Sequence, residues 1–443
     1  MELLKKLTEL QEKTGYLDLD GLKALSKEEG IPLPKLLGTA DFFSFFRLSP
    51  QEERSHIEDL YPVQKRGVLL RPDPNCRGYE KAKADPEGII DELKASGLLG
   101  RSGGGFPTGL KWVLTRDTEA DQKYIICNAD EGEPGTGKDR ALLKENPAAV
   151  IEGMAIAGLA VGADRGILYL RGEYADLRPG IEAAIAAAPV ENFHVEVFLG
   201  HGAYICGEET ALIASIEGER AEPRLKPPYP GAEGLYGKPT VVNNVETFAC
   251  VSLILREGAE AFRRYGTEDY PGPKLFTVLG CVTNPGVYEL EPGITLGALL
   301  EAAGGAAEGK TVKALLIGGG SGTVVNPDRD MILTPSGCQE KGASFGVASL
   351  RFLSEEEDLV RVLYELMDFY AKESCGVCVP CRVGLSRLAD LLKAYEEGKA
   401  PWNAREKVLE LTGYIVQNAR CAMSPAAVTP VITALRNFPE VLA

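Results

Sequence analysis

The spacing of apolar residues predicts alternating strands and helices through the centre of the chain. Between about residue 97 and residue 265, the runs KYIICN, GILYLR and HVEVFL predict buried strands. The longer apolar runs AAVIEGMAIAGLAV, GIEAAIAAA and EETALIASIEG follow them in turn and predict helices. This alternation predicts an α/β layered domain with a largely parallel sheet.

The two ends of the chain have helical patterns instead. Leu3, Leu7 and Leu10 recur at helical spacing, and Asp20 is the expected N-cap of a second helix, so residues 1–50 predict a small helical module. The tail from residue 354 is expected to be helical throughout. It opens with Ser354 as a cap and Glu357 three residues later, which is the sequence pattern of a capping box.

Residues 270–350 differ from both patterns. The short apolar runs KLFTVLGCV, GVYEL, KALLIGG and SLRFL predict strands, and LGALLEAAGG predicts one short helix among them. This segment is expected to form a small α+β domain. The glycine cluster GGGSG at 318–322 has no basic neighbour and is expected to be a plain loop.

Composition narrows the classes of partner. The chain has 443 residues and a formal net charge of −16, with a sequence pI of about 4.9. Nucleic acids and anionic membranes need a basic protein surface, so both are poor partners for this chain. The amphipathic start MELLKKLTEL lacks the uninterrupted apolar core of a signal peptide, and the longest apolar run is too short to span a bilayer. A soluble cytoplasmic protein is the expectation.

Three cysteines separated by two residues each stand in SCGVCVPCR, where Cys375, Cys378 and Cys381 can converge on one metal centre. A helix pair at 382–397 and 403–418 is expected to form a hairpin that returns Cys421 to the triplet. Three clustered cysteines with one remote fourth favour a [4Fe–4S] cluster, with a zinc site or no metal as the alternatives. Six other cysteines have no pairing pattern and are expected to be buried and structural: Cys76, Cys127, Cys206, Cys250, Cys281 and Cys338.

Five polar stretches lie in the α/β region. GRSGGGFPTGLKW (100–112) combines glycines, which let the backbone approach a phosphate or a planar ring, with the charges of Arg101 and Lys111. CNADEGEPGTGKDR (127–140) follows a predicted strand, where open α/β sheets bind ligands. The others are YICGEETAL, RLKPPYP and VVNNVET. Each alone could be a structural or solvated loop, but five in one domain predict a large, polar, multi-part ligand.

Together with ESCGVCVPC, these stretches resemble the NADH-oxidising flavoprotein subunit of respiratory complex I and its relatives in soluble hydrogenases and formate dehydrogenases. The resemblance runs from about residue 68 to the C-terminus. It implies an FMN- and NAD(H)-binding, modified Rossmann-like domain at 61–268, a ubiquitin-like (β-grasp) α+β domain at 269–352 and a helical [4Fe–4S]-binding bundle at 353–443. Residues 1–60 form the helical module and resemble instead the N-terminal helical part of the thioredoxin-like [2Fe–2S] subunit.

The resemblance also implies roles for individual residues. Cys375, Cys378, Cys381 and Cys421 would hold the [4Fe–4S] cluster. No side chain acts as an acid or base; Glu133 and Glu209 orient the dinucleotide beside Lys226, with Phe106 and Tyr229 against its adenine. Ser102 and Leu114 depart from the family pattern, at a loop glycine and at an adenine-stacking aromatic. The residues implied around FMN are Gly100, Arg101, Gly103, Lys111, Asn128, Asp130, Glu131, Tyr204, Gly207, Glu208, Asn243, Asn244 and Thr247.

The implied function is a two-to-one electron converter, which oxidises NAD(P)H or reduces NAD(P)+ through FMN and passes single electrons to the cluster. The alternative from another class is a non-redox scaffold that keeps the fold but has lost flavin. The implied partners are a thioredoxin-like [2Fe–2S] subunit and a further iron–sulfur or catalytic subunit, in a complex that is at most peripheral to a membrane. Four aromatics of the N-terminal module are candidates for docking the first partner: Phe42, Phe43, Phe45 and Phe46.

Overall fold

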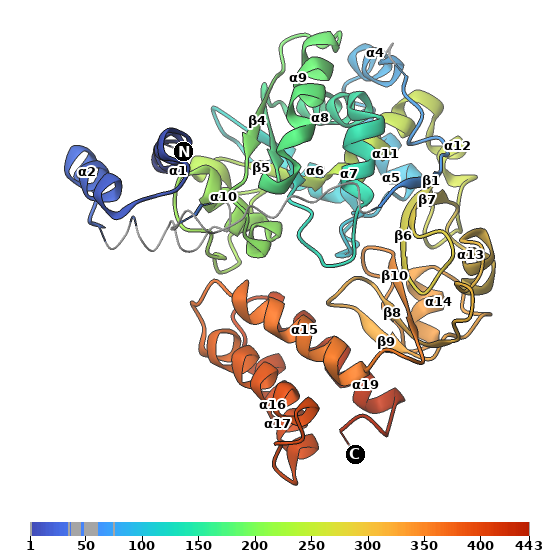
Figure 1. Cartoon of the computed structure of the whole chain (residues 1–443). Coiled ribbons are helices and arrows are strands. Elements are labelled where there is room, and N and C mark those ends of the chain that lie inside the picture. Colours follow the sequence, from blue (N-terminus) through green and yellow to red (C-terminus); the bar gives the residue numbers. More distant parts are fainter. Residues whose placement is uncertain (1, 34–35, 37–45, 48–60, 74–75, 443) are drawn as a thin grey trace.

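Figure 1 shows the computed structural model of the chain, which describes residues 2–33, 36, 46–47, 61–73 and 76–442. Phe42, Phe43 and Phe45 lie outside the described residues. The central α/β part, a second sheet and a group of C-terminal helices follow one another along the chain, and the N-terminal helices lie beside the first of these (Figure 1).

A parallel sheet forms the middle of the α/β part, as the sequence predicts. Its strands lie in the order β4-β3-β2-β5, and every neighbouring pair is parallel. Because parallel strands end at the same edge, Asn128 at the end of β2 lies beside Asn244 at the end of β5. The strands are β2 (Tyr124–Ala129), β3 (Arg165–Leu170), β4 (His194–Leu199) and β5 (Thr240–Asn244).

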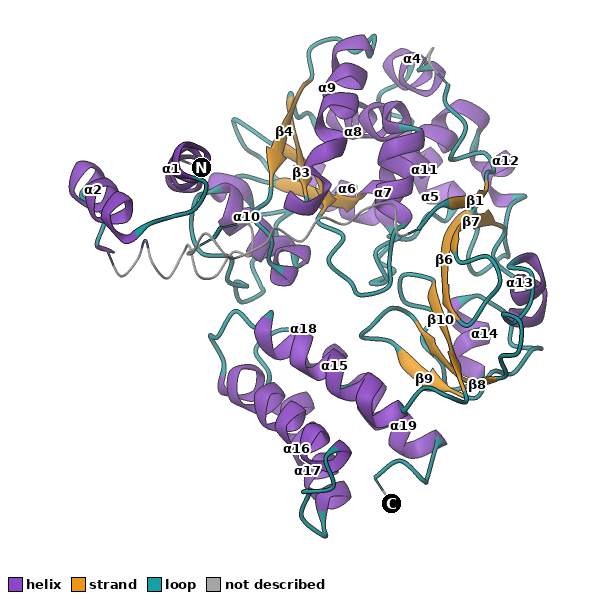
Figure 2. Cartoon of the chain, in the orientation of Figure 1, coloured by secondary structure: helices purple, strands orange, loops and turns teal. Residues whose placement is uncertain are grey.

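Helices cover this sheet (Figure 2). Helix α8 is apolar on every side and almost fully buried. It packs closely against α11 because Gly153 has no side chain: a Cβ there would lie 2.0 Å from the Phe248 carbonyl oxygen. The helices of this part are α4 (Arg77–Ala84), α5 (Ile89–Ser96), α6 (Thr108–Arg116), α7 (Lys138–Glu145), α8 (Pro147–Val161), α9 (Arg178–Ala187), α10 (Glu209–Ile216), α11 (Val245–Glu257) and α12 (Ala259–Arg263), with short 3₁₀ turns η1 (Gly172–Leu177), η2 (Tyr204–Gly207) and η3 (Leu235–Gly237).

The second sheet is mixed, with the strand order β1-β7-β6-β10-β8-β9. It contains the four predicted strands and two that the apolar pattern misses, because β1 and β9 have only three residues each. Strand β1 pairs with β7 although it precedes the α/β part in the chain. The elements are β1 (Val63–Lys65), β6 (Lys274–Gly280), β7 (Gly286–Leu290), α13 (Leu296–Ala302), β8 (Val312–Ile317), β9 (Thr323–Val325), α14 (Pro335–Glu340) and β10 (Ser349–Ser354).

The C-terminal part is helical, but its first helix begins later than predicted. Ser354 ends β10, and Asp358 caps the helix by accepting a hydrogen bond from the amide of Val360. Glu357 does reach back to the amide of Ser354, at 2.9 Å, so one half of the predicted capping box forms. The elements are α15 (Leu359–Lys372), a π-helical turn η4 (Pro380–Leu385), α16 (Ser386–Glu396), α17 (Ala404–Asn418), α18 (Met423–Ala427) and α19 (Thr429–Asn437).

The N-terminal module consists of α1 (Glu2–Thr14) and α2 (Leu19–Glu29). The N-cap of α2 is Asp18 rather than Asp20, because the Asp18 carboxylate accepts the amide of Gly21 at 2.5 Å. Leu4 and Leu7 of α1 belong to the same buried cluster as Ile213 of α10 and the helices of the C-terminal part. The module is therefore packed onto the rest of the chain.

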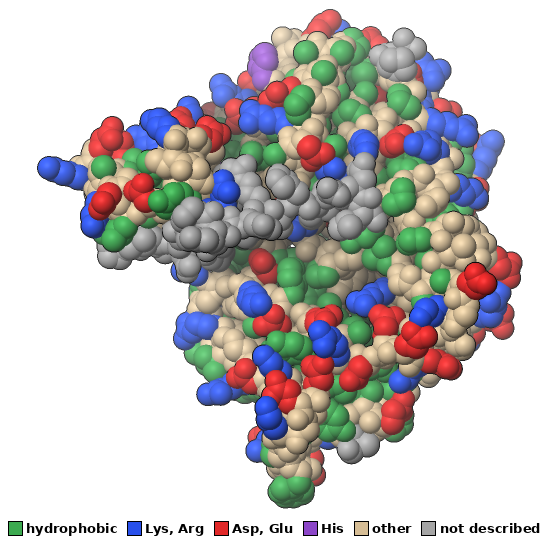
Figure 3. Space-filling model, viewed as in Figure 1, with side chains coloured by type: hydrophobic (Ala, Val, Ile, Leu, Met, Phe, Trp, Pro, Cys, Tyr) green, Lys and Arg blue, Asp and Glu red, His purple; other side chains and the backbone are tan. Residues whose placement is uncertain are grey.

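The surface carries both signs of charge. Lys and Arg side chains alternate with Asp and Glu on the face that Figure 3 shows, without a continuous basic area. No helix in the described ranges has the length and apolar character that crossing a membrane requires.

Candidate functional site

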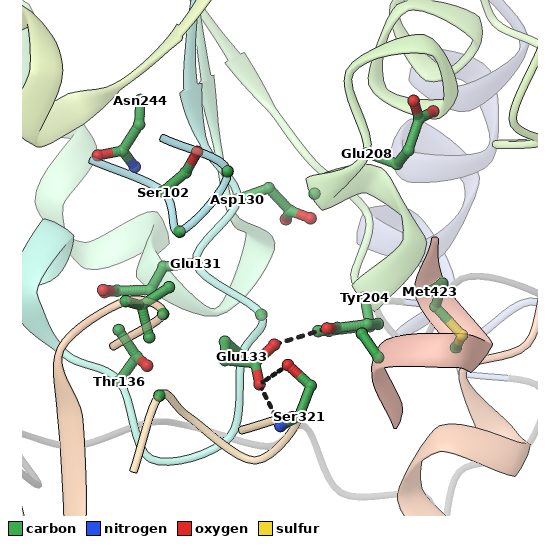
Figure 4. Close-up of a pocket in the computed structure, with 18 of the residues that line it drawn as sticks. Ser102, Asp130, Glu131, Glu133, Thr136, Tyr204, Glu208, Asn244, Ser321 and Met423 are labelled. Carbon is green, nitrogen blue, oxygen red and sulfur yellow. Dashed lines mark hydrogen bonds between the residues drawn. The ribbon is translucent and has the colours of Figure 1, made fainter. Parts of the chain in front are cut away.

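A cavity of about 580 Å³ opens where the carboxyl ends of the parallel strands face the second sheet and the C-terminal helices (Figure 4). Its volume is typical of sites for cofactors and substrates. The strand-end position follows from the parallel topology. Of the residues implied for FMN or the dinucleotide, those lining it are Gly103, Asn128, Asp130, Glu131, Glu133, Tyr204, Gly207, Glu208 and Asn244.

The glycine loop forms one wall of this cavity. A hydrogen bond of 2.9 Å from the amide of Gly100 to the carbonyl of Phe106 closes the loop. Gly103 has a φ of 98°, which other residues rarely adopt. A Cβ built at Gly104 would meet no atom within 4 Å, so the backbone itself faces open space. The loop leaves room for a ligand to approach its peptide groups, and Ser102 also faces the cavity.

The loop after β2 places two glutamates with different roles. Glu131 accepts hydrogen bonds from the amides of Asp139 and Arg140, at 2.9 and 3.1 Å, and thus caps α7. Glu133 accepts the Tyr204 hydroxyl at 2.6 Å and both the amide and the hydroxyl of Ser321, as the dashed lines in Figure 4 show. The Tyr370 hydroxyl of α15 also donates to Glu133, at 3.1 Å, so Glu133 joins its own loop to three other segments at the floor of the cavity.

Two polar atoms of the lining are buried without a hydrogen-bond partner. They are Asp130 Oδ2 and Thr136 Oγ1. Burial raises the pKa of Asp130 to about 8, because nearby Arg171 offsets only part of the cost of an ionised carboxylate in this site. Burial and the charge of Asp139 likewise raise the pKa of Glu131 to about 7. Both acids are thus poised to hold a proton near neutral pH.

A network of buried charged residues lies behind the wall of the cavity that contains Lys138. Lys138 lines the cavity and contacts Asp139 at 2.5 Å, while its ammonium donates to Asn244 Oδ1 at 3.0 Å. Glu246 lies 3.4 Å from Lys138 and 2.5 Å from Lys274, and its side chain is fully buried. Sequence reasoning missed Lys138 as a lining residue, although it stands inside the quoted stretch 127–140.

Some implied FMN residues have their side chains turned away from the cavity. The guanidinium of Arg101 lies 4.2 Å from the centre of the Tyr270 ring and donates to the carbonyl of Pro271. Thr247 accepts the amide of Arg101 at 2.9 Å, and Asn243 accepts the indole N–H of Trp112 at 2.9 Å. These three residues hold the glycine loop and its neighbours in place.

Of the residues implied for the dinucleotide, Glu133 lines the cavity, whereas Glu209 and Lys226 do not line it but pair with each other beside Glu208, which does. Glu209 lies between two ammonium groups, 3.0 Å from Lys111 and 2.7 Å from Lys226. Burial acts to raise its pKa, but the two lysines outweigh burial and lower it. Lys226 also contacts Glu208 at 2.8 Å. The rings of Phe106 and Tyr229 are 48% and 61% exposed, so both offer accessible aromatic surface.

The cavity also contains residues that the sequence analysis did not select. The expectation that GGGSG at 318–322 is a plain loop is wrong, because Gly318 and Ser321 line the cavity. Ala422, Met423 and other residues from 422–429 close the opposite side. Both groups come from segments far from the nucleotide motifs in sequence, so only the tertiary packing brings them to the site.

The four implied cluster ligands lie in the C-terminal part. Cys375 and Cys381 are buried, and Cys378 and Cys421 are partly buried. The pKa of the Cys421 thiol is raised, mainly by burial and to a smaller extent by the neighbouring Cys375 and Cys378. In the described part of the chain, no three His, Cys, Asp or Glu side chains are arranged to hold one metal ion. A zinc ion needs its sulfur ligands at about 2.3 Å. A cubane takes one thiolate on each of its four irons, and four cysteines are the donor set that this part of the chain supplies.

The cavity also fits FMN. It has the needed volume, a glycine-rich wall that leaves backbone open at Gly104, and the unpartnered acceptor Asp130 Oδ2 for a donor on the ligand. Lys138 supplies positive charge to the lining. The fold and site thus define an α/β nucleotide-binding redox module joined to a helical part with four clustered cysteines.

Comparisons with known proteins agree. Residues 93–253 match the family model of the Nuo51 FMN-binding domain, residues 275–325 the SLBB domain, and residues 361–443 the NADH-ubiquinone oxidoreductase-F iron-sulfur binding region. An F subunit of the NADH-quinone oxidoreductase of Rhizobium meliloti is 41% identical over 378 residues, which are 82% of this chain and 90% of that protein.

Hydrogenase subunits are also similar. The alpha subunit of the NAD-reducing hydrogenase HoxS of Cupriavidus necator is 41% identical over 80% of this chain, and the match spans 60% of that longer protein. A crystal structure of an NAD+-reducing [NiFe]-hydrogenase in the air-oxidised state superposes with a TM-score of 0.89 at 31% identity, over 98% of this chain and 92% of that chain. The chain belongs to the family of the NADH-quinone oxidoreductase F subunits, with their FMN-binding and [4Fe–4S]-binding domains.

The predicted family and its cofactors are therefore confirmed, as is the mixed α/β class with parallel strands. Membership of a redox family does not favour the scaffold alternative. The domain boundaries at 60, 268 and 352 and the roles of individual residues stay predictions.

Proposed function

We propose that this chain oxidises NADH, or reduces NAD+, at FMN bound in the large cavity and exchanges single electrons with a [4Fe–4S] cluster held by Cys375, Cys378, Cys381 and Cys421. It does so as one subunit of a larger redox complex. When bound, FMN supplies the conversion between two-electron nicotinamide chemistry and one-electron cluster chemistry.

One observation supports this function most directly. The cavity is lined on one side by Asp130 and Glu131, and on the other by Ala422 and Met423, which directly follow Cys421. A ligand that touches both walls lies next to a proposed cluster ligand. Electron transfer weakens steeply with distance, so this adjacency is the arrangement that an electron converter requires.

The chain's own residues bind the flavin and orient the dinucleotide. The glycine loop at 100–106 and Asp130 hold the flavin, while Glu133 fixes Tyr204 and Ser321 at the cavity floor. Phe106 and Tyr229 stack on adenine, and Glu209 with Lys226 orients the dinucleotide. Correct positioning lets the hydride leave the nicotinamide without a protein acid or base.

The partners are a thioredoxin-like [2Fe–2S] subunit and a further iron–sulfur or catalytic subunit. Val379, Val383 and Val416 are 50%, 45% and 45% exposed in the helices that carry or flank the cysteines. Exposed apolar side chains at such a place suit an interface with the next electron carrier. Phe46 does not belong to an exposed docking face: it is 5% exposed and stacks on His201. Docking by Phe42, Phe43 and Phe45 stays a hypothesis, and residues 269–352 are assigned to a ubiquitin-like domain.

A purified sample tests the function. We expect visible flavin bands that bleach on addition of NADH and iron close to four atoms per chain. Cys378→Ser should lose iron but keep the bleaching, because the flavin site does not use that thiol. Flavin bands that fail to bleach with NADH in the wild type would contradict the proposal.

A further inference from the structure

A second, much smaller cavity lies behind Tyr204. Its volume is about 20 Å³, and its wall includes Asp130, Gly132 and Tyr204, which also line the large cavity. The remaining wall includes Arg171 and Glu173. Asp130 therefore stands between the two cavities, with one face toward the cofactor site and the other toward this pocket.

Asp130 and Glu173 both line the small cavity, and each has one buried carboxylate oxygen without a hydrogen-bond partner. One is Asp130 Oδ2, and the other is Glu173 Oε2. The second oxygen of Glu173 is already engaged, since it accepts from Arg171 Nη2 at 2.9 Å. A volume of this size holds one water molecule, and a water can donate one hydrogen to each of two acceptors. One water held between Asp130 and Glu173 would give each of these oxygens a donor.

Solvent exposure increases from Asp130 to Glu173 and Arg171. Asp130 is 7% exposed, whereas the side chains of Glu173 and Arg171 are 13% and 20% exposed. The charged groups that face Asp130 are Arg171, Glu173 and Glu373. The Tyr204 hydroxyl is turned away to Glu133. This line of groups therefore leads from the cofactor cavity toward solvent.

The proposed reaction creates a need for such a route. Conversion of NADH to NAD+ yields two electrons and one proton, and the electrons leave through the iron–sulfur cluster. The proton has to leave the buried site separately. This step rests on the proposed function, because it concerns the proton of that same reaction.

We propose that Asp130 gives its proton, through one water held between Asp130 Oδ2 and Glu173 Oε2, to Glu173 and then to solvent, and takes in its place the proton that the reduced flavin would release as its electrons leave. The O–H bond to Asp130 breaks as the water takes this proton and gives one of its own to Glu173, so protons are conserved at each transfer. The reverse sequence delivers a proton when NAD+ is reduced.

The proton affinity of Asp130 agrees with this role. Burial raises its pKa to about 8, so this carboxyl exchanges a proton near neutral pH. An ordinary aspartate is ionised at that pH and binds a proton too weakly to accept one in each turnover. The geometry of the cavity and its two oxygens remains the basis of the assignment.

Rapid mixing of the FMN-loaded protein separates the two half-reactions. Glu173→Gln keeps an oxygen for Arg171 but cannot take a proton. We expect it to leave the rate of flavin bleaching by NADH within about twofold, to slow reoxidation by ferricyanide at least about tenfold, and to raise the solvent deuterium isotope effect on reoxidation. Glu182→Gln, an exposed carboxylate that pairs with Arg178 on α9, is the matched control and should change neither rate.

Infrared spectra of the protein before NADH is added give a second readout. The carboxylic acid band of Asp130 is identified as the one that disappears in Asp130→Asn. This band should titrate near pH 8 in the wild type, and the pH of that titration should shift in Glu173→Gln. An unchanged reoxidation rate in Glu173→Gln, or a missing Asp130 band at pH 7, would overturn the proton route. If the wild type does not bleach with NADH, the proposed function fails, and the infrared titration still decides whether Asp130 and Glu173 are linked.

Discussion

The imidazole of His201 lies 3.1 Å from the hydroxyl of Thr8, although 193 residues separate them in the chain. The Thr8 hydroxyl already donates to the carbonyl of Leu4, so the His201 Nε2–H donates to Thr8. The same ring stacks on Phe46 at 5.1 Å. His201 precedes Tyr204 by three residues, so the N-terminal module is fastened to the loop that carries a cavity residue.

Acid should loosen this attachment. Burial lowers the pKa of His201 to about 4. When the module detaches, the exposed imidazole returns to an ordinary pKa near 6.5 and binds a proton more tightly. The attachment of the N-terminal module therefore becomes less stable as pH falls from about 6.5 toward about 4, by up to about 3 kcal/mol. Hydrogen exchange of α1 amides, corrected for the intrinsic pH dependence, measures this opening.

Two variants make that experiment specific. His201→Gln carries no titrating ring, so the free energy of opening α1 should lose most of its pH dependence. His194→Gln removes an exposed imidazole and should behave like the wild type. An opening free energy that stays constant in the wild type between about pH 7 and about pH 4.5 would show that His201 does not control the attachment.

The fourth cluster ligand can be tested separately. Cys421→Ser should lower the iron content and the broad charge-transfer absorbance, because a serine hydroxyl is a poor substitute for a thiolate ligand. Cys281→Ser is the matched control, since this partly buried cysteine lies in the second sheet region. Equal iron loss in both variants would rule out Cys421 as a specific ligand.

Sequence patterns predicted the strands whose apolar residues run continuously or alternate regularly. Strands β2, β3 and β4 are continuous apolar runs or alternate regularly, so their positions were correct within one or two residues. Strand β5 was not predicted, because Asn243 and Asn244 make it look like a polar loop. Those amides lie in a buried strand since Trp112 and Lys138 provide their hydrogen bonds.

Only those site residues that lie within the sequence motifs themselves could be predicted. The loop after β2 follows a strand, so its carboxylates could be placed at the sheet edge. Ser321 and Met423 come from the second sheet region and the C-terminal helices, and no local pattern marks them as cavity residues. Arg101 shows the reverse case: its motif is correct, but its side chain packs on Tyr270.

Removing the charge of Glu246 should destabilise the α/β part. This carboxylate is fully buried between Lys274 and Lys138 and also accepts the amide of Leu275. Glu246→Gln leaves the buried ammonium of Lys274 without its counter-charge, while Lys138 keeps Asp139, and losses of about 3–5 kcal/mol are typical of a broken buried ion pair. The denaturant midpoint, followed by the fluorescence of buried Trp112, measures the change.

An exposed pair provides the comparison for Glu246. Glu260→Gln breaks a contact with Arg264 in which both side chains are largely exposed, so its effect should stay below about 1 kcal/mol. Similar shifts in the two variants would mean that the buried network contributes no more than a surface ion pair.

The ring of Phe106 should bind the adenine of the dinucleotide. It is 48% exposed at the end of the glycine loop, so its surface is accessible to a planar ligand. Phe106→Ala should weaken NADH binding by roughly 1–3 kcal/mol, the range for loss of a stacked base, while FMN stays bound. Calorimetric titration with NADH and the flavin absorbance of the same sample measure the two effects. Val416→Ala removes a similarly exposed apolar side chain on α17 and should change neither. If NADH binds Phe106→Ala as tightly as the wild type, the ring serves only to pack the loop.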